Sequence, residues 1–202
     1  MTLPPGAASV EPDEFRRALR LRPEGVTIVT ASDEFGHLLG LTASSCTSVS
    51  LDPPLLLVCI LNRSPLLGPM SAGAHFTVHL LSARQEQLAK HFATRMIDKF
   101  DGMGLKFRIT ASGCPRLEGA LAAIECSPHE LFPGGDHTIV VGRVVDICLD
   151  KECDAGLLTF DGRLQSLRVS TKLELGTQGE ERGTQESHRR RKRVITTSGE
   201  KK

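Results

Sequence analysis

The sequence predicts a mainly β protein, built as a closed or nearly closed antiparallel barrel with a few flanking helices. Short runs of apolar and β-branched residues recur along the chain and are separated by Gly, Pro and Asp turn signals. Only two segments have a good helical pattern, which is too few for helices to alternate with the strands of a doubly wound sheet. The G-x-G at residues 102–104 follows no predicted strand and lacks a third glycine, so it is not a Rossmann fingerprint.

The first expected elements are a short helix and a hairpin. Residues 12–21 are apolar on one helical face, and Asp13 is the expected N-cap. Residues 25–30, GVTIVT, are β-branched and bounded by turn signals. They predict a strand that pairs with residues 38–45.

The middle of the chain predicts two strands and a capped helix. Residues 55–61 are too apolar and too short for anything but a buried strand, and residues 62–73 fit a loop with one turn of helix. Residues 76–81 predict the next strand. Ser82 with Gln85 matches a capping box, and the helix that it opens carries one apolar face, made of Leu88, Ala89, Phe92 and Ala93.

The last third predicts three more strands, at residues 121–127, 137–149 and 157–160. Beyond them the chain is polar and aperiodic. We therefore expect one folded domain at residues 13–168, a disordered N-terminus at 1–12 and a disordered basic tail at 169–202.

Composition limits the function classes. The chain has 202 residues and is 40% hydrophobic and 24% charged, as an ordinary globular protein is. Residues 1–168 hold 16 Lys and Arg against 19 Asp and Glu, so the folded part gives no electrostatic case for nucleic-acid binding. The run RRRKR at 189–193 is expected to be solvated, with a nucleic-acid or protein-docking role as the alternative.

Localisation and metal content are also constrained. No segment is long and apolar enough to span a membrane, and the N-terminus lacks a secretory pattern, so we expect a cytoplasmic protein. The six cysteines form no C-x-x-C pair and have no histidine at ligand spacing. We expect free thiols and no metal site.

The most informative stretch is residues 40–59, where a hydroxyl-rich strand leads through two prolines into an apolar strand. One face of the expected strand carries hydroxyls, at Thr42, Ser44, Ser48 and Ser50. Ser45 and Thr47 interrupt the alternation, which indicates a bulge or turn with free backbone N–H groups at residues 44–47. Such N–H groups beside hydroxyls suit a phosphate, although a plain hydroxyl-bearing strand has the same pattern.

Two motifs resemble those of one family. The sequence motif T-A-S-S-x-x-S-V-S-L-D-P-P-L at residues 42–55 resembles the flavin-binding segment of the flavin reductase family of two-component monooxygenase systems. Gly135, Asp136 and His137 resemble the family's G-D-H signature, although alone they are also an ordinary hairpin turn and strand start. The resemblance extends over residues 15–167.

The resemblance implies an FMN-binding split β-barrel with Greek-key order. It also implies a homodimer with flavin near the subunit interface. The implied reaction is the reduction of FMN or FAD by NADH or NADPH, and the reduced flavin is then supplied to a separate flavin-dependent monooxygenase. A non-catalytic flavin-binding split barrel is the alternative.

The resemblance also assigns site residues. Thr42, Ala43, Ser44 and Ser45 would contact the ribityl and phosphate groups of the flavin. The expected remainder of the flavin pocket comprises Cys59, Arg63 as a phosphate counter-charge, Ser64, Phe92 and Lys99. Core packing for Phe92 and a solvated charge for Lys99 are the alternatives. His137 would lie where the nicotinamide docks.

Three residues depart from the family pattern. They are Cys46 in place of a frequent Phe, His79 in place of a frequent Asn, and Leu164 in place of a usual Tyr. Each is expected to touch or border the pocket.

Overall fold

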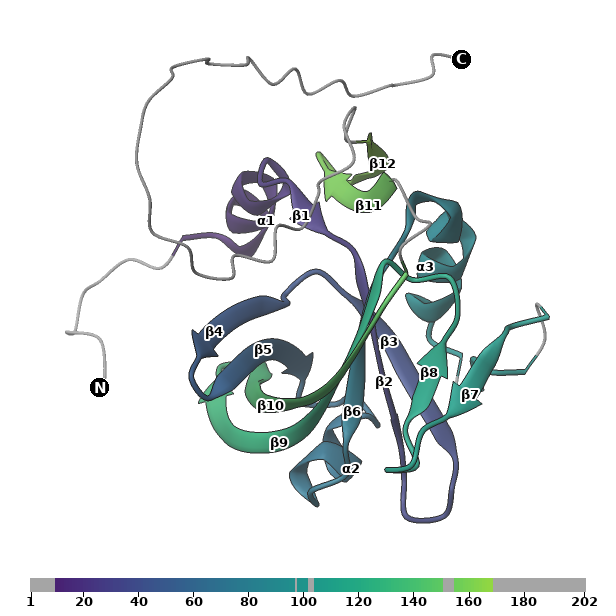
Figure 1. The fold of residues 1–202 in the computed structure, drawn as a ribbon. Coiled ribbons are helices and arrows are strands. Elements are labelled where there is room, and N and C mark those ends of the chain that lie inside the picture. Colours follow the sequence, from purple (N-terminus) through teal and green to yellow (C-terminus); the bar gives the residue numbers. More distant parts are fainter. Residues whose placement is uncertain (1–9, 97, 102–103, 151–154, 169–202) are drawn as a thin grey trace, which may run out of the picture.

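The computed structural model describes residues 10–96, 98–101, 104–150 and 155–168, which form a mainly β protein (Figure 1). The expected basic tail at 169–202 and residues 1–9 of the expected disordered N-terminus lie outside the described residues. The helices are α1 Pro12–Arg20, α2 Leu67–Ser71 and α3 Glu86–Phe92, with the 3-10 turn η1 Ala83–Gln85 before α3. The strands are β1 Glu24–Gly25, β2 Thr27–Ser32, β3 Leu38–Ala43, β4 Thr47–Leu51, β5 Pro54–Leu61, β6 Phe76–Leu80, β7 Phe107–Ile109, β8 Pro115–Leu117, β9 Ala122–Gly134, β10 His137–Leu149, β11 Ala155–Phe160 and β12 Arg163–Arg168.

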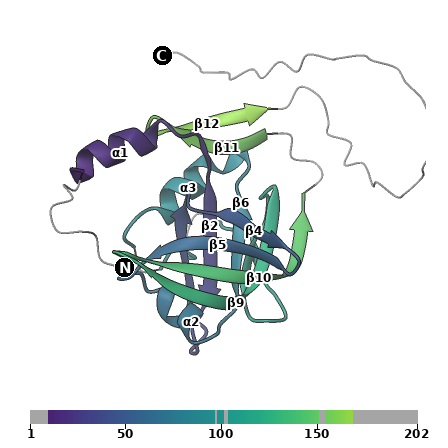
Figure 2. The same cartoon turned by 90° about the vertical axis from the view of Figure 1, so that its left-hand side faces the viewer.

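One antiparallel sheet of seven strands organises the fold, in the order β3-β2-β6-β9-β10-β5-β4. Strands β3 and β4 are neighbours in sequence and yet form the two opposite edges of this sheet. Residues 44–46 therefore cross from one edge to the other, and four peptide links reach at most about 14 Å. The sheet must curl to bring its edges this close, as Figures 1 and 2 show. The predicted split barrel is confirmed.

This crossing corrects one expectation. A single hydroxylated strand through residues 42–51 is wrong, because β3 ends at Ala43 and β4 begins at Thr47. Ser48 and Ser50 therefore lie on the edge opposite Thr42. The expected break near Ser44 is confirmed, and it is a change of sheet edge, which alternation along a single strand cannot reveal.

Most other elements match their expected positions. The hairpin of β2 with β3 and the strand β5 form as predicted, although only alternate residues of β5 are fully buried. The capping box of Ser82 and Gln85 is present and opens η1, which leads into α3. Asp13, however, is not the cap of α1. The helix begins at Pro12, and Glu11 occupies the N-cap position without a side-chain cap bond.

Three short strands had no clear signal in the sequence. Strands β7 and β8, of three residues each, form an antiparallel pair. Strand β12 pairs with β11 in a small separate sheet of the order β1-β11-β12. The segments FRI and PRL are too short to display a period, so only their tertiary neighbours define them as strands.

The barrel interior is apolar and closely packed. Its centre is a cluster of fully buried side chains that includes Val58, Phe76 and Val140. Gly142 lies against Phe76, and a Cβ at this position would come within 2.4 Å of the Phe76 ring. A larger residue at position 142 would therefore displace a core aromatic ring. Among the described residues, no helix is long and apolar enough to cross a membrane.

Candidate active site

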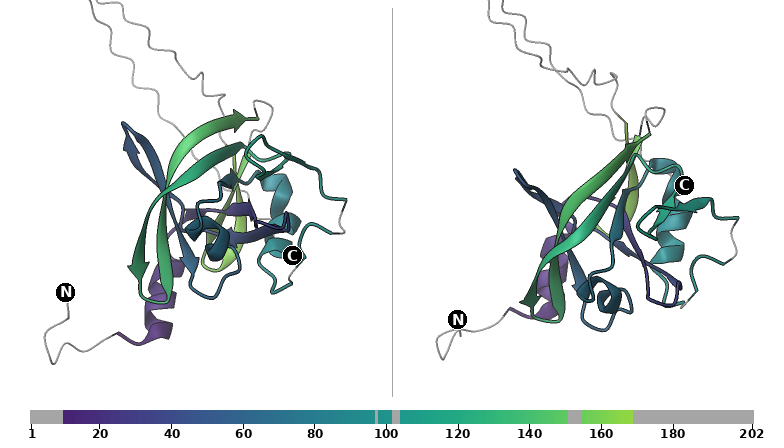
Figure 3. Two further views of the ribbon diagram at one scale, coloured as in Figure 1. Left: turned by 90° about the horizontal axis from the view of Figure 1, so that it is seen from below. Right: turned by 60° about the horizontal axis from the view of Figure 1, so that its bottom comes forward.

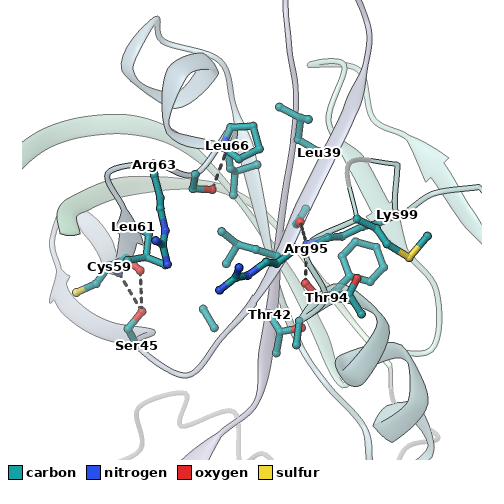
Figure 4. Close-up of a pocket in the computed structure, with 18 of the residues that line it drawn as sticks. Leu39, Thr42, Ser45, Cys59, Leu61, Arg63, Leu66, Thr94, Arg95 and Lys99 are labelled. Atoms are coloured by element: carbon teal, nitrogen blue, oxygen red, sulfur yellow. Dashed lines mark hydrogen bonds between the residues drawn. The ribbon is translucent and has the colours of Figure 1, made fainter. Parts of the chain in front are cut away.

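A cavity of about 700 Å³ lies at the split of the barrel, between the β3 edge, the 44–46 crossing and β5 (Figure 4). The loop after β5, the C-terminal end of α3 and the start of β10 complete its walls. All ten residues that the resemblance assigns to the site line it: Thr42, Ala43, Ser44, Ser45, Cys59, Arg63, Ser64, Phe92, Lys99 and His137. The fold thus brings together residues that are up to 95 positions apart in sequence.

Ser45 ties the crossing segment to β5. Its hydroxyl donates to the carbonyl of Cys59 at 3.2 Å and accepts from the Cys59 N–H at 3.0 Å. Strand β4 pairs with β5 only from Pro54 to Leu57, so it provides no partner for Cys59. The Ser45 hydroxyl replaces that missing strand partner, and its proton is therefore already engaged.

Thr42 and Lys99 tie α3 to β3. The Thr42 hydroxyl donates to the Ala89 carbonyl at 2.7 Å. The Lys99 ammonium donates to the carbonyls of Gly40, at 3.0 Å, and Phe92, at 2.7 Å. Phe92 is the last residue of α3, so Lys99 places a positive charge on a free carbonyl at the negative end of that helix. Partial burial lowers the pKa of Lys99.

Phe92 belongs both to the cavity wall and to the core. Its side chain is fully buried in a second apolar cluster, where its ring packs edge-to-face against that of Phe100 with 5.4 Å between the ring centroids. A Cβ on Gly40 would lie 2.5 Å from the Phe92 ring, so glycine at position 40 allows the helix to approach the strand. The core-packing alternative for Phe92 is therefore compatible with its position at the cavity.

The crossing segment offers unused hydrogen-bond donors. Among the described residues, the N–H groups of Ser44, Ser45 and Cys46 have no backbone acceptor, and the Ser44 hydroxyl has no partner. The hydroxyl of Ser64 accepts from the N–H of Leu66 at 3.3 Å, which leaves its own proton free to be donated. These donors are grouped where the chain leaves one sheet edge for the other.

The charges that line the cavity are positive. Arg63 and Arg95 extend into it from opposite walls (Figure 4), and Lys99 lies behind Arg95. No Asp or Glu is among the described residues that line it. The nearest carboxylate, that of Asp136 beside His137, lies outside the lining, although the Arg63 charge helps to lower its pKa. The lining's donors and cations favour an anionic ligand such as a phosphate.

His137 is held in place by the hairpin turn between β9 and β10. Its Nδ1 lies 2.7 Å from Oδ1 of Asp136, and this hydrogen bond lowers the pKa of Asp136. Asn62 fixes the turn, because its N–H donates to the Asp136 carbonyl and its amide donates to the Gly135 carbonyl, both at 3.0 Å. The Nε2 atom of His137 has no hydrogen-bond partner among the described residues. It remains available to a ligand.

Several lining residues were not foreseen. Gly40 and the aliphatic side chains of Leu39 and Leu41 form the β3 wall, and Thr94, Arg95 and Met96 follow α3. Alternation along residues 38–43 could have indicated the leucines. The direction of Arg95 depends on how the segment after α3 folds back to Lys99, for which the sequence has no local signal.

None of the three departures from the family pattern lines the cavity, but Cys46 directly follows Ser45 and Leu164 packs against the cluster of Phe92, both of which line it. The expectation that each residue touches or borders the pocket is therefore wrong for His79. His79 is fully buried between β2 and β8, where its Nδ1 donates to the Ile28 carbonyl and its Nε2 accepts from the Leu117 N–H, each at 3.0 Å. Cys46 packs against the barrel core, and Leu164 packs against the cluster around Phe92. Cys46 interrupts the run of site residues, but its thiol is a core group, and burial raises its pKa.

Comparison with known proteins identifies the class. The model of the flavin reductase like domain matches residues 19–168, so the chain belongs to that family. A flavin reductase from Pseudomonas putida is 38% identical over 156 residues, which cover 77% of this chain and 89% of that protein. The reductase subunit of a stachydrine N-demethylase from Rhizobium meliloti is 40% identical over 134 residues, which cover 66% of this chain and 57% of that protein. The match therefore spans little more than half the length of that relative.

The fold is that of solved reductases. The NADH:FAD oxidoreductase of Streptomyces globisporus, determined in complex with NAD and FAD fragments, superposes with a TM-score of 0.71 at 36% identity, and the match covers 83% of this chain and all of that one. The split-barrel architecture and its relation to flavin reductases follow from this likeness together with the family match.

Proposed function

We propose that the protein is an NAD(P)H-dependent flavin reductase. In this proposal it takes hydride from NADH or NADPH, reduces FMN or FAD, and supplies the reduced flavin to a separate flavin-dependent monooxygenase. The observation that carries the proposal is the cavity at the barrel split, whose described lining combines unused N–H donors and three cations without a carboxylate. These groups fit the phosphate of a flavin.

Different residues of the chain bind the phosphate and the ring of a flavin. The N–H groups of Ser44 and Ser45, the Ser44 hydroxyl and Arg63 would bind the phosphate. Thr42 and Ser45 act through the backbone that they hold in place, because their hydroxyl protons are donated within the protein. The flavin ring would rest on Leu39, Leu41 and Phe92, because the described lining has no other large apolar surface on that side and the chain has neither Trp nor Tyr.

His137 orients the nicotinamide. Hydride passes from C4 of the reduced nicotinamide to N5 of the flavin, so the nicotinamide loses two electrons and the flavin gains them. The protein has to hold the two rings in contact and exclude competing geometries. Asp136 and the anchored turn fix the His137 ring, whose free Nε2 can hydrogen-bond the donor.

The protein is proposed to act in the cytoplasm as a homodimer. Ile147 and Leu149 lie on one face of β10, just after the register shift at residues 144–146, and each residue is 54% exposed; Val145, within the shift, is 49% exposed. A row of apolar side chains of this kind on a sheet favours burial against a second copy. Sedimentation should give twice the chain mass, and Ile147→Asp should shift the protein towards monomer. A monomeric wild-type protein would exclude the dimer.

The activity test follows nicotinamide oxidation while free FMN and FAD are varied. We expect turnover only when flavin is present. Flavin binding without any oxidation of NADH or NADPH would instead identify a non-catalytic flavin-binding module. Absence of both binding and turnover would overturn the proposal altogether.

A further inference from the structure

The turn that carries His137 is not fixed by packing. Strands β9 and β10 form the longest hairpin among the described residues, and its turn end lies beside α1 in both views of Figure 3. Residues 129–136 at this end are all exposed, and Gly134 and Gly135 add backbone freedom to the turn. The ladder between β10 and β5 stops at the pair of His137 with Leu61. Hydrogen bonds beyond that pair therefore have to hold the turn against β5.

Asn62 and Thr138 provide these bonds. Asn62 directly follows β5, and its backbone N–H and its side-chain amide donate to the carbonyls of Asp136 and Gly135. The Thr138 hydroxyl donates to Oδ1 of the same amide at 2.9 Å. This bond orients the amide so that its nitrogen, and not its oxygen, faces the Gly135 carbonyl. Both ends of the Asn62 side chain are therefore engaged, one by the turn and the other by β10.

The pair of Asn62 and Thr138 lies outside the flavin cavity. Neither residue is among the described residues that line it, although the adjacent residues Arg63 and His137 are. Side chains alternate along a strand, so Thr138 points to the face of β10 opposite that of His137. Any effect of the pair on a bound ligand therefore has to pass through the residues that the pair holds.

We propose that Asn62 and Thr138 are positioning residues for hydride transfer, which hold the His137 turn against β5 in the geometry that the reaction needs. This inference rests on the proposed function. The nicotinamide and the flavin react only within a narrow range of distance and angle, so a small shift of the orienting histidine lowers the rate.

The kinetic test measures flavin reduction in a single turnover at saturating nicotinamide. Asn62→Ala removes both side-chain bonds and should lower this rate about tenfold, whereas Thr138→Val removes one and should lower it about threefold. Thr138→Ser keeps the hydroxyl and should retain most of the wild-type rate. Thr47→Val is the matched control and should leave the rate unchanged, because Thr47 is exposed on β4 and does not line the cavity.

Flavin affinity distinguishes this role from a contact with the flavin. Arg63 and Ser64 belong to a turn with its own hydrogen bond, from the Ser64 N–H to the Leu61 carbonyl at 2.8 Å. The dissociation constants of FMN and FAD should therefore change by less than about twofold in Asn62→Ala. A loss of flavin affinity as large as the loss of rate would overturn the inference.

A double-mutant cycle tests whether the pair acts through His137. The orienting ring is absent in the His137→Ala background, so Asn62→Ala should there lower the rate by less than about twofold instead of about tenfold. Equal losses in the two backgrounds would contradict the inference, because the pair would then only support the fold. If Asn62→Ala does not fold, the same cycle with Thr138→Val and Thr138→Ser decides the question.

A spectroscopic test reports on the contact itself. Asn62 is the only asparagine of the chain, so isotope-labelled asparagine gives a single side-chain amide in NMR spectra. Its two protons should have well-separated chemical shifts in the wild type and in Thr138→Ser, and should approach the values of a free amide in Thr138→Val. An unchanged signal in Thr138→Val would show that the hydroxyl does not hold the amide, and the inference would fail.

The outcomes also separate this inference from the proposed function. If the wild-type protein does not reduce flavin with NADH or NADPH, the proposed function fails and the inference falls with it. If the wild-type protein is active and both Asn62→Ala and Thr138→Val keep its rate, the proposed function stands and the inference alone is overturned.

Discussion

Two polar regions of this molecule use similar residues to different ends. At the barrel split, Arg63 forms no ion pair and the N–H groups of Ser44 and Ser45 have no backbone acceptor among the described residues, and all three residues line a cavity. At the β8–β9–β10 contact, the Arg116 side chain is only 10% exposed and donates to both Glu125 and Asp146. The first region is prepared for a ligand, and the second is complete within the chain.

The difference lies in where the compensating charge comes from. Burial alone would raise the pKa of Glu125, but hydrogen bonds from Ser112, Thr110, His75 and Arg116 outweigh burial and lower it. Glu125 therefore stays ionised against a guanidinium of the same chain, and the pair contributes to the fold. Arg63 and Arg95 are instead exposed and form no ion pair among the described residues, although the charge of Arg63 helps to lower the pKa of nearby Asp136. Water solvates these two cations, and an anionic ligand can replace that water.

Two histidines repeat the contrast. His79 uses both ring nitrogens inside the core, and burial, with a further contribution from the Arg116 charge, lowers its pKa to about 4. His137 bonds Asp136 with one nitrogen and leaves the other without a partner among the described residues. A histidine with two internal partners supports the fold, and one with a free nitrogen at a cavity can meet a ligand.

The largest expected effect comes from breaking the internal ion pair. Arg116→Met leaves buried Glu125 without its cation and should lower the free energy of unfolding by about 4 kcal/mol. The melting temperature should fall by about 8 to 16 °C. Flavin reduction by the folded variant should be unchanged. Urea unfolding measures the loss, and exposed Arg84→Met, the control, should change it by less than about 0.5 kcal/mol. A similar loss in both variants would contradict this assignment.

The second effect is a pH dependence from His79. Its folded pKa of about 4 is below the unfolded value of 6.5, so the unfolded state binds the extra proton between these values. The contribution is complete above pH 6.5 and is lost as the pH falls through 4, and its total is about 3 kcal/mol. Urea unfolding at several pH values should show a smaller acid loss for His79→Asn than for wild type. Parallel curves would show that His79 titrates normally.

The third effect concerns hydride transfer. His137→Ala should lower kcat/KM for the nicotinamide donor about ten- to a hundredfold, or about 1.4 to 2.8 kcal/mol, because the donor loses its orienting group. Flavin affinity should hardly change, because the phosphate donors lie on the 44–46 crossing. Both constants are measured on one variant. If flavin binding collapses while the donor KM stays the same, His137 belongs to the flavin pocket instead.

The smallest effect separates two adjacent serines. Ser45→Ala removes the partner of the Cys59 N–H and carbonyl and should lower the free energy of unfolding by about 1 kcal/mol. Ser44→Ala should leave stability unchanged and weaken flavin binding about fivefold, which is also about 1 kcal/mol. Thermal unfolding and flavin titration on both variants test this division. Equal stability of the two variants would mean that Ser45 is not part of the internal framework.

The sequence by itself determined the elements with local signals, and its family resemblance proposed the candidate site residues. The period-two strands, the Ser82 capping box and the Pro-bounded strand β5 follow from short-range sterics and hydrogen bonding, which act within a few residues. The family motifs at residues 42–55 and 135–137 contain five of the candidate site residues, the wider resemblance supplied the other five, and all ten line one cavity.

Only the tertiary structure decided which of those groups remain free. Alternation cannot show that β3 and β4 form opposite edges of one sheet, that Ser45 completes the bonding of β5, or that Lys99 binds the end of α3. The same limit explains His79, whose place in the core depends on β2 and β8, each more than 30 residues away. A side chain's partners are set by segments distant in sequence, and the absence of such partners is what makes a polar group available to a ligand.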